Sequence, residues 1–376
     1  MAPVEINSVG SYLDTIDSMN QAHVKAFFRG QGDIEWQIES SIARRNRSIE
    51  ATYLKLAEHR GIERTNADFV KLDFTRKIHR QFVDSYPTFP EVHLLKGYNL
   101  NDIDMMMVSQ HYGLPTRLID WSLNPLIALY FATEESLDKD ACVFMLSDSS
   151  PHSEHLSFSN SQTLLNTIER ERQFAKKLIK MKEAIFAAPI PVQDIDLSAP
   201  DTRETVFFPL MSLLKDFNSS NIELVHAHLL AKFGPNKPIQ VANWLQKVLS
   251  NDDIPNALQD NSSIKIESRG HFLIKPLPLN QRIKNQQGVF QFSQSPFGRD
   301  SLNDEIRDFG DCENADRHLN LIRIKIPAAH KVKINTELAR YGISRDFVYP
   351  EIDNFTKEMT QNTANELLHA LLPPNT

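Results

Sequence analysis

The stretch from Asn124 to Ala132 constrains the fold most, because it predicts a helix without a polar face. Asn124 is a favourable N-cap residue, and Pro125 suits the first helical turn. The residues that follow, Leu126 to Ala132, are apolar or aromatic on every side. A helix of this kind belongs in a protein core. The rest of the chain must therefore fold around it.

The segment just before this helix places two charged side chains beside the predicted core. It runs from Gln110 to Trp121, reads QHYGLPTRLIDW, and contains Arg117 and Asp120. Buried charge needs a partner. The two residues could form an ion pair that pins a loop, or they could flank a helix start whose free N–H groups hold an anion or are satisfied by the Asp120 carboxylate.

Periodic patterns elsewhere predict strands and helices around this segment. A strand at residues 24–28 ends at Arg29-Gly30-Gln31, and its alternation places Phe27, Arg29 and Gln31 on one face. Further strands are expected at 141–146, 270–275, 287–293 and 321–326, and helices at 53–82 and 102–110. No βαβ repeat, GxGxxG or GxxxxGKS/T motif occurs. We therefore predict an α+β fold with a mixed or mostly antiparallel sheet and flanking helices.

One long segment interrupts this pattern. Residues 151–265 read as helices separated by proline-containing loops, which predicts an inserted helical subdomain. The insertion divides the main domain into residues 1–150 and residues 266–376, which together complete the sheet. Its mixed-charge helices suit either recognition of a substrate or simple enlargement of the fold.

The composition restricts the classes of partner. A net charge of −7 and a pI near 6.0 do not favour a protein that coats nucleic acid, although a local basic groove would be compatible with them. No apolar run is long enough to span a bilayer and the N-terminus lacks a targeting pattern, so we expect a cytoplasmic protein without a membrane partner. Cys142 and Cys312 lack the spacing of a disulfide framework or a zinc site, and we expect no metal.

Two short motifs carry groups that could bind a ligand. Arg29 offers a planar fork that suits phosphate, and Gly30 would let a ligand or another backbone approach closely. A solvent-exposed arginine on an edge strand would have the same local sequence. His111 and Tyr112 supply a titratable ring and a phenol near Arg117, but a core histidine and tyrosine bonded to the backbone would look identical.

A third motif places two amides at the start of a predicted strand. Gln286 and Gln287 precede Gly288, and amides of this kind orient ligands but cannot act as general bases. The alternative is a turn in which both side chains bond to the backbone.

The order of these pieces resembles the FRG domain family. Phe28-Arg29-Gly30-Gln31 is followed by residues 110–132, then by Arg282 with Gln286 to Phe290, and finally by residues 342–352. The family takes its name from the Phe-Arg-Gly segment, and QHYGLPTRLIDW followed by NPLIALYFA is its most specific feature. The resemblance implies that residues 1–150 and 266–376 are two halves of an FRG domain. This family occurs largely in prokaryotic and phage-associated proteins and is frequently linked to conflict systems.

A second resemblance is to ADP-ribosyltransferases that carry an arginine on their first strand in a Tyr/Phe-Arg-Gly context. It implies an ADP-ribosyltransferase-like core in which Arg29 binds NAD and residues 116–121 shape the nicotinamide pocket. The region of Gln287 would correspond to the late strand that normally carries a catalytic glutamate. Because Gln286 and Gln287 stand there instead, another acid would have to stabilise the oxocarbenium-like state, and Asp120 is the first candidate.

The resemblances together imply an NAD-consuming transferase that moves ADP-ribose onto a protein or nucleic acid, as a toxin or phage-defence effector. An antitoxin or a phage trigger would then be an expected partner. NAD would be a substrate and no metal would be needed. Two alternatives stay open: a non-catalytic module that binds a nucleotide or a phage protein, and a phosphate-directed nuclease. The predicted catalytic residues are Asp120, His111 and Gln287, and the predicted NAD-binding residues are Arg29, Gly30, Gln31, Tyr112, Thr116 and Arg117.

Overall fold

The computed structural model describes two compact units, of which the first contains the sheet. The first unit comprises residues 1–71, 77–162 and 270–376, and the second comprises 72–76 and 163–269. Most of the predicted insertion, 151–265, lies outside the described residues. The described residues are 6–19, 24–61, 67–89, 95, 97–149, 156–169, 271–277, 280–293, 300–309, 319–352, 354–356, 359–360 and 363–364.

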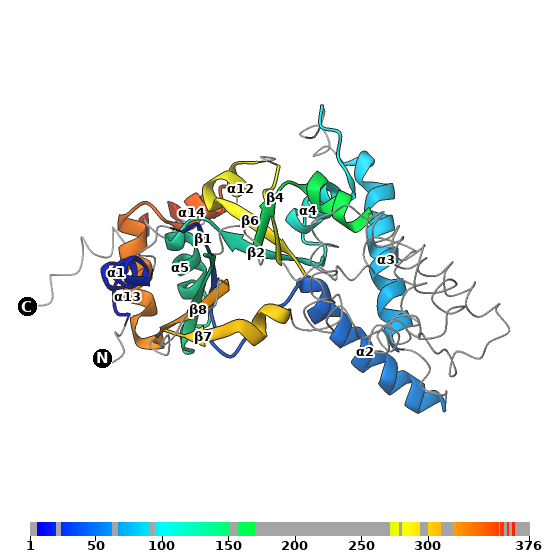
Figure 1. The fold of residues 1–376 in the computed structure, drawn as a ribbon, viewed down its shortest axis with the longest axis horizontal. Coiled ribbons are helices and arrows are strands. Elements are labelled where there is room, and N and C mark those ends of the chain that lie inside the picture. Colours follow the sequence, from blue (N-terminus) through cyan, green and yellow to red (C-terminus); the bar gives the residue numbers. More distant parts are fainter. Residues whose placement is uncertain are drawn as a thin grey trace, which may run out of the picture. The chain divides into compact units, whose positions relative to one another are not determined.

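The first unit is built on an eight-stranded mixed sheet with the order β4-β5-β6-β2-β1-β3-β8-β7. The β4–β5 and β7–β8 pairs are parallel, and the other neighbours are antiparallel (Figure 1). The predicted α+β class with a mixed or mostly antiparallel sheet is thereby confirmed. The strands are β1 (Ala26–Gln31), β2 (Leu118–Ser122), β3 (Ala141–Asp148), β4 (Leu156–Ser159), β5 (His271–Ile274), β6 (Gly288–Phe292), β7 (Ile306–Asp308) and β8 (Leu319–Ile326).

Strand β4 extends the sheet beyond the boundary predicted at residue 150. It pairs in parallel with β5, so that Leu156 lies opposite His271. The Asp148 carboxylate accepts a hydrogen bond from the Leu156 backbone N–H and ties the end of β3 to the start of β4. The contribution of the first unit therefore continues to Gln162 before the chain enters the second unit.

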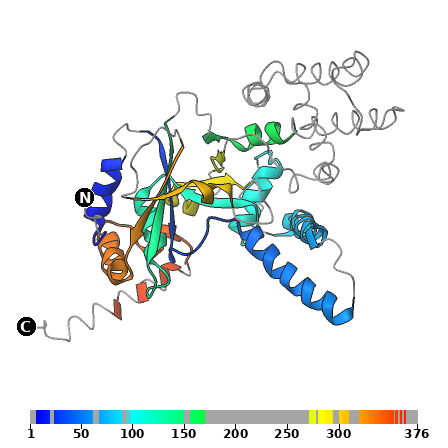
Figure 2. The same cartoon turned by 60° about the horizontal axis from the view of Figure 1, so that its bottom comes forward.

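Both faces of the sheet are covered, because β1 and β3 send alternate side chains into two separate cores. On one face α5 (Pro125–Thr133) packs with α1 (Val9–Met19) and α13 (Ala328–Arg340) around Phe28 and Val143. In Figure 2, α1 in blue and α13 in orange lie together on one side of the strands. On the other face Phe27, Trp121 and Phe144 form the second core. Burial of this apolar surface on both faces is the main stabilising term of the fold.

The helix predicted from residues 124–132 forms as expected. The Asn124 side chain caps α5 by accepting from the Leu126 N–H, and Pro125 occupies the first turn. Three further helices of the described part carry comparable caps. Ser40 caps α2 (Ser41–Arg60), Asn101 and Asp104 form a capping box at α4 (Asp102–His111), and Asn280 caps α12 (Gln281–Gln286). The other described helices are α3 (Ala67–Ser85) and α14 (Arg345–Val348), with short 3-10 turns η1 (Tyr86–Thr88) and η5 (Ser301–Glu305).

Candidate functional site

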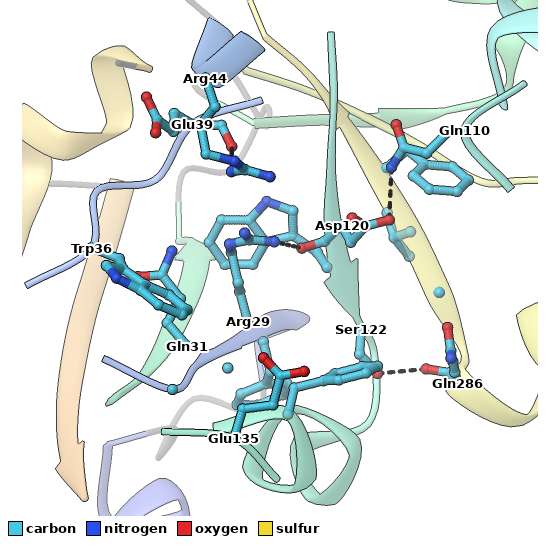
Figure 3. Close-up of a pocket in the computed structure, with 18 of the residues that line it drawn as sticks. Arg29, Gln31, Trp36, Glu39, Arg44, Gln110, Asp120, Ser122, Glu135 and Gln286 are labelled. Carbon is cyan, nitrogen blue, oxygen red and sulfur yellow. Dashed lines mark hydrogen bonds between the residues drawn. The ribbon is translucent and has the colours of Figure 1, made fainter. Parts of the chain in front are cut away.

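A cavity of about 940 Å³ opens over the central strands of the first unit. Its walls come from β1, β2 and β6, from the loop that connects β1 to α2, and from the first turns of α2. The end of α4, the end of α5 and α12 complete the lining. Figure 3 shows charged and amide side chains from these elements around the space. The volume lies at the upper end of what small-molecule and cofactor sites commonly have.

Arg29 stands at the centre of this cavity, on the face of β1 that the strand alternation predicts. Its Nη1 donates to the backbone oxygen of Asp120 at 2.6 Å. Its Nε is buried and has no hydrogen-bond partner among the described residues. Burial lowers the pKa of Arg29, the Asp120 charge opposes that effect, and the positive charge of Arg44 adds to it. The guanidinium nevertheless stays charged, so an unsatisfied cationic donor lines the cavity.

Asp120 presents its carboxylate to the same cavity from β2. The Gln110 Nε2 at the end of α4 donates to Asp120 Oδ1 at 2.8 Å, and the Thr116 hydroxyl donates to the Gln110 amide oxygen. The three side chains form a hydrogen-bonded chain that fixes the position of the carboxylate, and Figure 3 shows the link from Gln110 to Asp120. Thr116 therefore supports the site from behind and does not line it. Asp120 does not cap α5, because Asn124 has that role.

Arg117 does not line the cavity. It is 1% exposed, and its Nε and Nη2 donate to the Ser293 carbonyl at 3.0 and 2.7 Å. Its guanidinium also lies over the Phe292 ring, 4.4 Å from the centroid. The alternative of an Arg117–Asp120 ion pair is not observed between these two described residues, and the Asp120 carboxylate instead accepts a hydrogen bond from Gln110. Arg117 thus joins the loop before β2 to the end of β6, and the prediction that it binds NAD directly is not supported by its position.

Gly30 is required by packing of the chain on itself. A Cβ at this position would lie 1.8 Å from the Ala128 oxygen and 2.7 Å from the Ala132 nitrogen, both backbone atoms of α5. The close approach that the sequence suggests therefore occurs, and it occurs between β1 and α5. Gly30 also lines the cavity, so its backbone remains accessible to a ligand there.

His111 lines the main cavity and also a second cavity of about 200 Å³, whereas Tyr112 lines only the second. The Asn280 Nδ2 lies 2.7 Å from His111 Nε2. Because the Asn280 oxygen caps α12 at the Ile283 N–H, its amino group must be the one that faces His111. His111 Nε2 is then an acceptor and the ring is neutral. Burial and the nearby Arg282 lower the pKa of His111, which agrees with this assignment.

The two glutamines before β6 have different positions. Gln287 ends α12 in the left-handed conformation, with φ of 45°, and does not line the cavity. Gln286 does line the cavity. Its side-chain Nε2 donates to the Val348 carbonyl, and its backbone carbonyl accepts from the Ser122 hydroxyl. The catalytic role predicted for Gln287 is therefore not supported by its place, and Gln286 is the amide that faces the cavity.

Several lining residues were not singled out from the sequence. Trp36 precedes α2 with half of its surface exposed, and Glu135 follows α5. Charged residues in and before α2 also line the cavity: Glu35, Glu39, Arg44 and Arg47.

Arg282 belongs to the ordered motifs but had no predicted role. It packs over the Tyr349 ring at 4.9 Å, lies 3.5 Å from the Glu351 carboxylate and lines the cavity.

The fold and this cavity define an α+β protein with a large polar site over its central strands. Residues 24–141 match the family model of the FRG domain, so the chain carries an FRG domain. The match begins just before β1 and ends at the first residue of β3, and it includes Arg29, Gln110 and Asp120.

Comparison with curated proteins and with solved structures adds nothing to this assignment. No curated protein and no solved structure matches the chain. Among the described residues, no helix is long and apolar enough to cross a membrane. The same part of the chain contains no group of three His, Cys, Asp or Glu residues arranged to hold a metal ion.

Proposed function

We propose that the cavity binds NAD and that the protein transfers ADP-ribose from it to a macromolecule. The observation that carries this proposal is the state of Arg29: a buried guanidinium Nε without a partner, close enough to Arg44 for the two positive charges to oppose each other. An anion between the two groups would remove both penalties. The pyrophosphate of NAD is such an anion.

The proposed chemistry needs a carboxylate close to this anion site. Asp120 meets the requirement, because its backbone oxygen accepts from Arg29 while its carboxylate is held by Gln110. In the transfer, the bond between the ribose carbon and the nicotinamide nitrogen breaks, and neutral nicotinamide leaves with the electron pair. Asp120 would stabilise the cationic ribose until a nucleophile of the acceptor forms the new bond and loses its proton.

His111 would have a different role from the general acid or base that its residue type suggests. Its Nε2 is occupied by Asn280, and burial together with Arg282 lowers its pKa. The ring is therefore neutral, carries its proton on Nδ1, and would pack beside the ligand without transferring a proton. Gln286, bound at both its backbone and its side chain, would form a fixed wall of the ribose site.

The test is to follow nicotinamide release and label transfer from labelled NAD in the presence of cell extract. Wild-type protein should release nicotinamide, and Arg29→Ala and Asp120→Asn should each lower the rate at least about a hundredfold if they act in the transition state. Arg45→Ala is the matched control, because Arg45 is an exposed arginine of α2 outside the cavity lining.

The outcomes separate the alternatives. NAD that stays intact with folded wild-type protein contradicts the transfer. Saturable binding of NAD without products would instead identify a non-catalytic nucleotide-binding module. Cleavage of a nucleic acid that depends on a divalent metal would favour the nuclease alternative.

A further inference from the structure

Gln31 carries a buried acceptor without a donor, two residues beyond Arg29 on the same face of β1. The side chain is 4% exposed and lines the cavity. Its Nε2 donates to the Gln37 carbonyl at 3.4 Å, and its Oε1 has no partner among the described residues. Because the Gln37 carbonyl requires a donor, the amide is oriented with its oxygen free. A buried acceptor without a donor destabilises the protein, and a ligand N–H that bonds to this oxygen would remove the penalty.

Trp36 directly precedes Gln37 in the chain, and the Gln37 carbonyl is the group that receives the hydrogen bond from Gln31. The indole is 50% exposed and lines the same cavity. Its loop is held by a turn in which the Trp36 N–H donates to the Asp33 carbonyl, and by the Ile34 N–H bonded to the Asp140 carbonyl. A large aromatic side chain on a fixed loop can stack on a planar ligand at little entropic cost.

We propose that Gln31 and Trp36 form the subsite for an aromatic ring of the bound nucleotide, and that this ring carries an amino or carboxamide group. The ring stacks on Trp36, and its N–H donates to Gln31 Oε1. This inference rests on the proposed function and names the part of the ligand that each residue recognises. Arg29 and Arg44 bind the phosphates, while Gln31 selects a ring that has a donor over one that lacks it.

Two rings of NAD carry such a donor, the 6-amino group of adenine and the carboxamide of nicotinamide. Two dinucleotide analogues separate them without changing charge. One lacks the 6-amino group of the purine, and the other has an acetyl group in place of the carboxamide. Calorimetric titration of NAD and both analogues into the full-length protein measures the contribution of each donor.

We expect wild-type protein to bind one of the two analogues at least about tenfold more weakly than NAD, because a site built around an acceptor rejects a ring without the donor. Gln31→Leu should bind that analogue and NAD equally. Trp36→Ala should weaken NAD binding about tenfold or more, and Trp36→Phe should retain most of the affinity. Tyr98→Ala, which removes an exposed aromatic side chain outside the cavity, should bind as wild type does.

Specific results would overturn the proposal. Equal affinity of wild-type protein for NAD and both analogues excludes the subsite, and so does discrimination that survives in Gln31→Leu. If Gln31→Leu does not fold, unchanged NAD affinity in Trp36→Ala excludes it independently. Binding with the expected selectivity but without nicotinamide release supports the subsite and contradicts the transfer. Nicotinamide release without selectivity among the analogues supports the transfer and contradicts the subsite.

Discussion

The Gln110 side chain holds the carboxylate of Asp120 by a hydrogen bond of 2.8 Å from Nε2 to Oδ1. The Thr116 hydroxyl donates to the other end of the same amide, so Gln110 cannot rotate without losing a partner. The end of α4 and the loop before β2 therefore determine where the carboxylate of β2 lies. A catalytic group needs this kind of support to keep its productive geometry.

Replacement of Gln110 should affect turnover more than binding. In Gln110→Leu the Asp120 carboxylate loses its donor, and we expect kcat for nicotinamide release to fall about tenfold with a nearly unchanged KM. Thr116→Ser keeps the hydroxyl and should retain wild-type kcat. Steady-state kinetics on the three proteins provides the measurement. A Gln110→Leu protein with wild-type kcat would exclude the positioning role.

Arg29 and Arg117 should respond in opposite ways to truncation. Arg117→Ala removes a buried guanidinium, leaves the Ser293 carbonyl without these donors and opens space against Phe292, so the free energy of unfolding should fall by about 3 kcal/mol. Arg29→Ala removes the cost of burying the charge, the attraction to Asp120, one hydrogen bond and a repulsion with Arg44. These changes oppose one another, and the free energy of unfolding should change by about 1 kcal/mol or less. Urea denaturation of both variants measures these changes. A larger loss of stability in Arg29→Ala than in Arg117→Ala would contradict the structural role of Arg117.

The contrast between these arginines shows what local sequence can and cannot predict. Alternation along β1 placed Arg29 and Gln31 on one face, and the structure agrees because a strand has a fixed period of two. Arg117 lies before β2 begins, so no period governs its direction. Its partner is Ser293, 176 residues away in the sequence, and only the β2–β6 pairing brings the two together.

Other differences have equally physical causes. The strong cap and apolar body predicted α5 well, since those signals act within one helical turn. Gln286 and Gln287 could not be distinguished by type, because a left-handed residue at the end of α12 turns one away from the cavity. Trp36 reaches the cavity through the course of a loop, and loop courses depend on packing by distant segments.

Gly30→Ala should be strongly destabilising. The new Cβ would overlap backbone atoms of Ala128 and Ala132 in α5, and neither β1 nor α5 can move because both are buried. We expect a protein that fails to fold or loses at least about 3 kcal/mol of stability. Gly10→Ala is the control, since its Cβ would meet only Ser8 Oγ at 3.8 Å within helix α1. Thermal melts of both variants test this, and equal melting temperatures would contradict the close approach.

Stability should depend on pH through His111. Its pKa in the folded protein lies below the ordinary value of 6.5, chiefly because of burial and then because of Arg282, while Glu351 opposes both. The unfolded chain therefore takes up the proton first as pH falls. The contribution of neutral His111 is complete above about pH 6.5 and is lost progressively below it. NMR titration of the ring and urea denaturation at pH 5 and pH 8 measure both effects.

A substitution at Asn280 should reverse this dependence. Asn280→Asp keeps an oxygen to cap α12 and presents the other oxygen to His111, so protonated His111 gains a partner and its pKa rises above that of the unfolded chain. The added stability is then present at pH 5 and is lost as pH rises through the folded pKa. His111→Gln should show neither dependence. An unchanged His111 titration in Asn280→Asp would contradict the contact between residue 280 and the ring.

Lys331 should be essential for the part of the cavity wall that Gly32 and Glu135 form. This fully buried residue of α13 donates from Nζ to the carbonyls of Gly32, Glu135 and Ser136 at 3.0, 2.6 and 2.8 Å. Gly32 and Glu135 both line the cavity, so one ammonium joins the loop after β1 to the end of α5. Lys331→Met keeps the length of the side chain but removes the ammonium donor from all three oxygens. Among the described residues only the Ser136 oxygen keeps another donor, the Lys139 N–H, so the free energy of unfolding should fall by roughly 3 kcal/mol or more.

The matched control for Lys331 is an exposed lysine of the same helix. Lys333→Met removes only a surface interaction with Glu337 at 3.8 Å and should change stability by no more than about 0.5 kcal/mol. Hydrogen exchange should also show faster opening around residues 32–36 in Lys331→Met, because that loop loses its anchor to α13. Equal stability of the two variants would mean that the cluster of carbonyls does not depend on the ammonium. Selective loss of protection around Gly32 would show that α13, which packs with α5 in one core, helps to hold the loop that lines the ligand site.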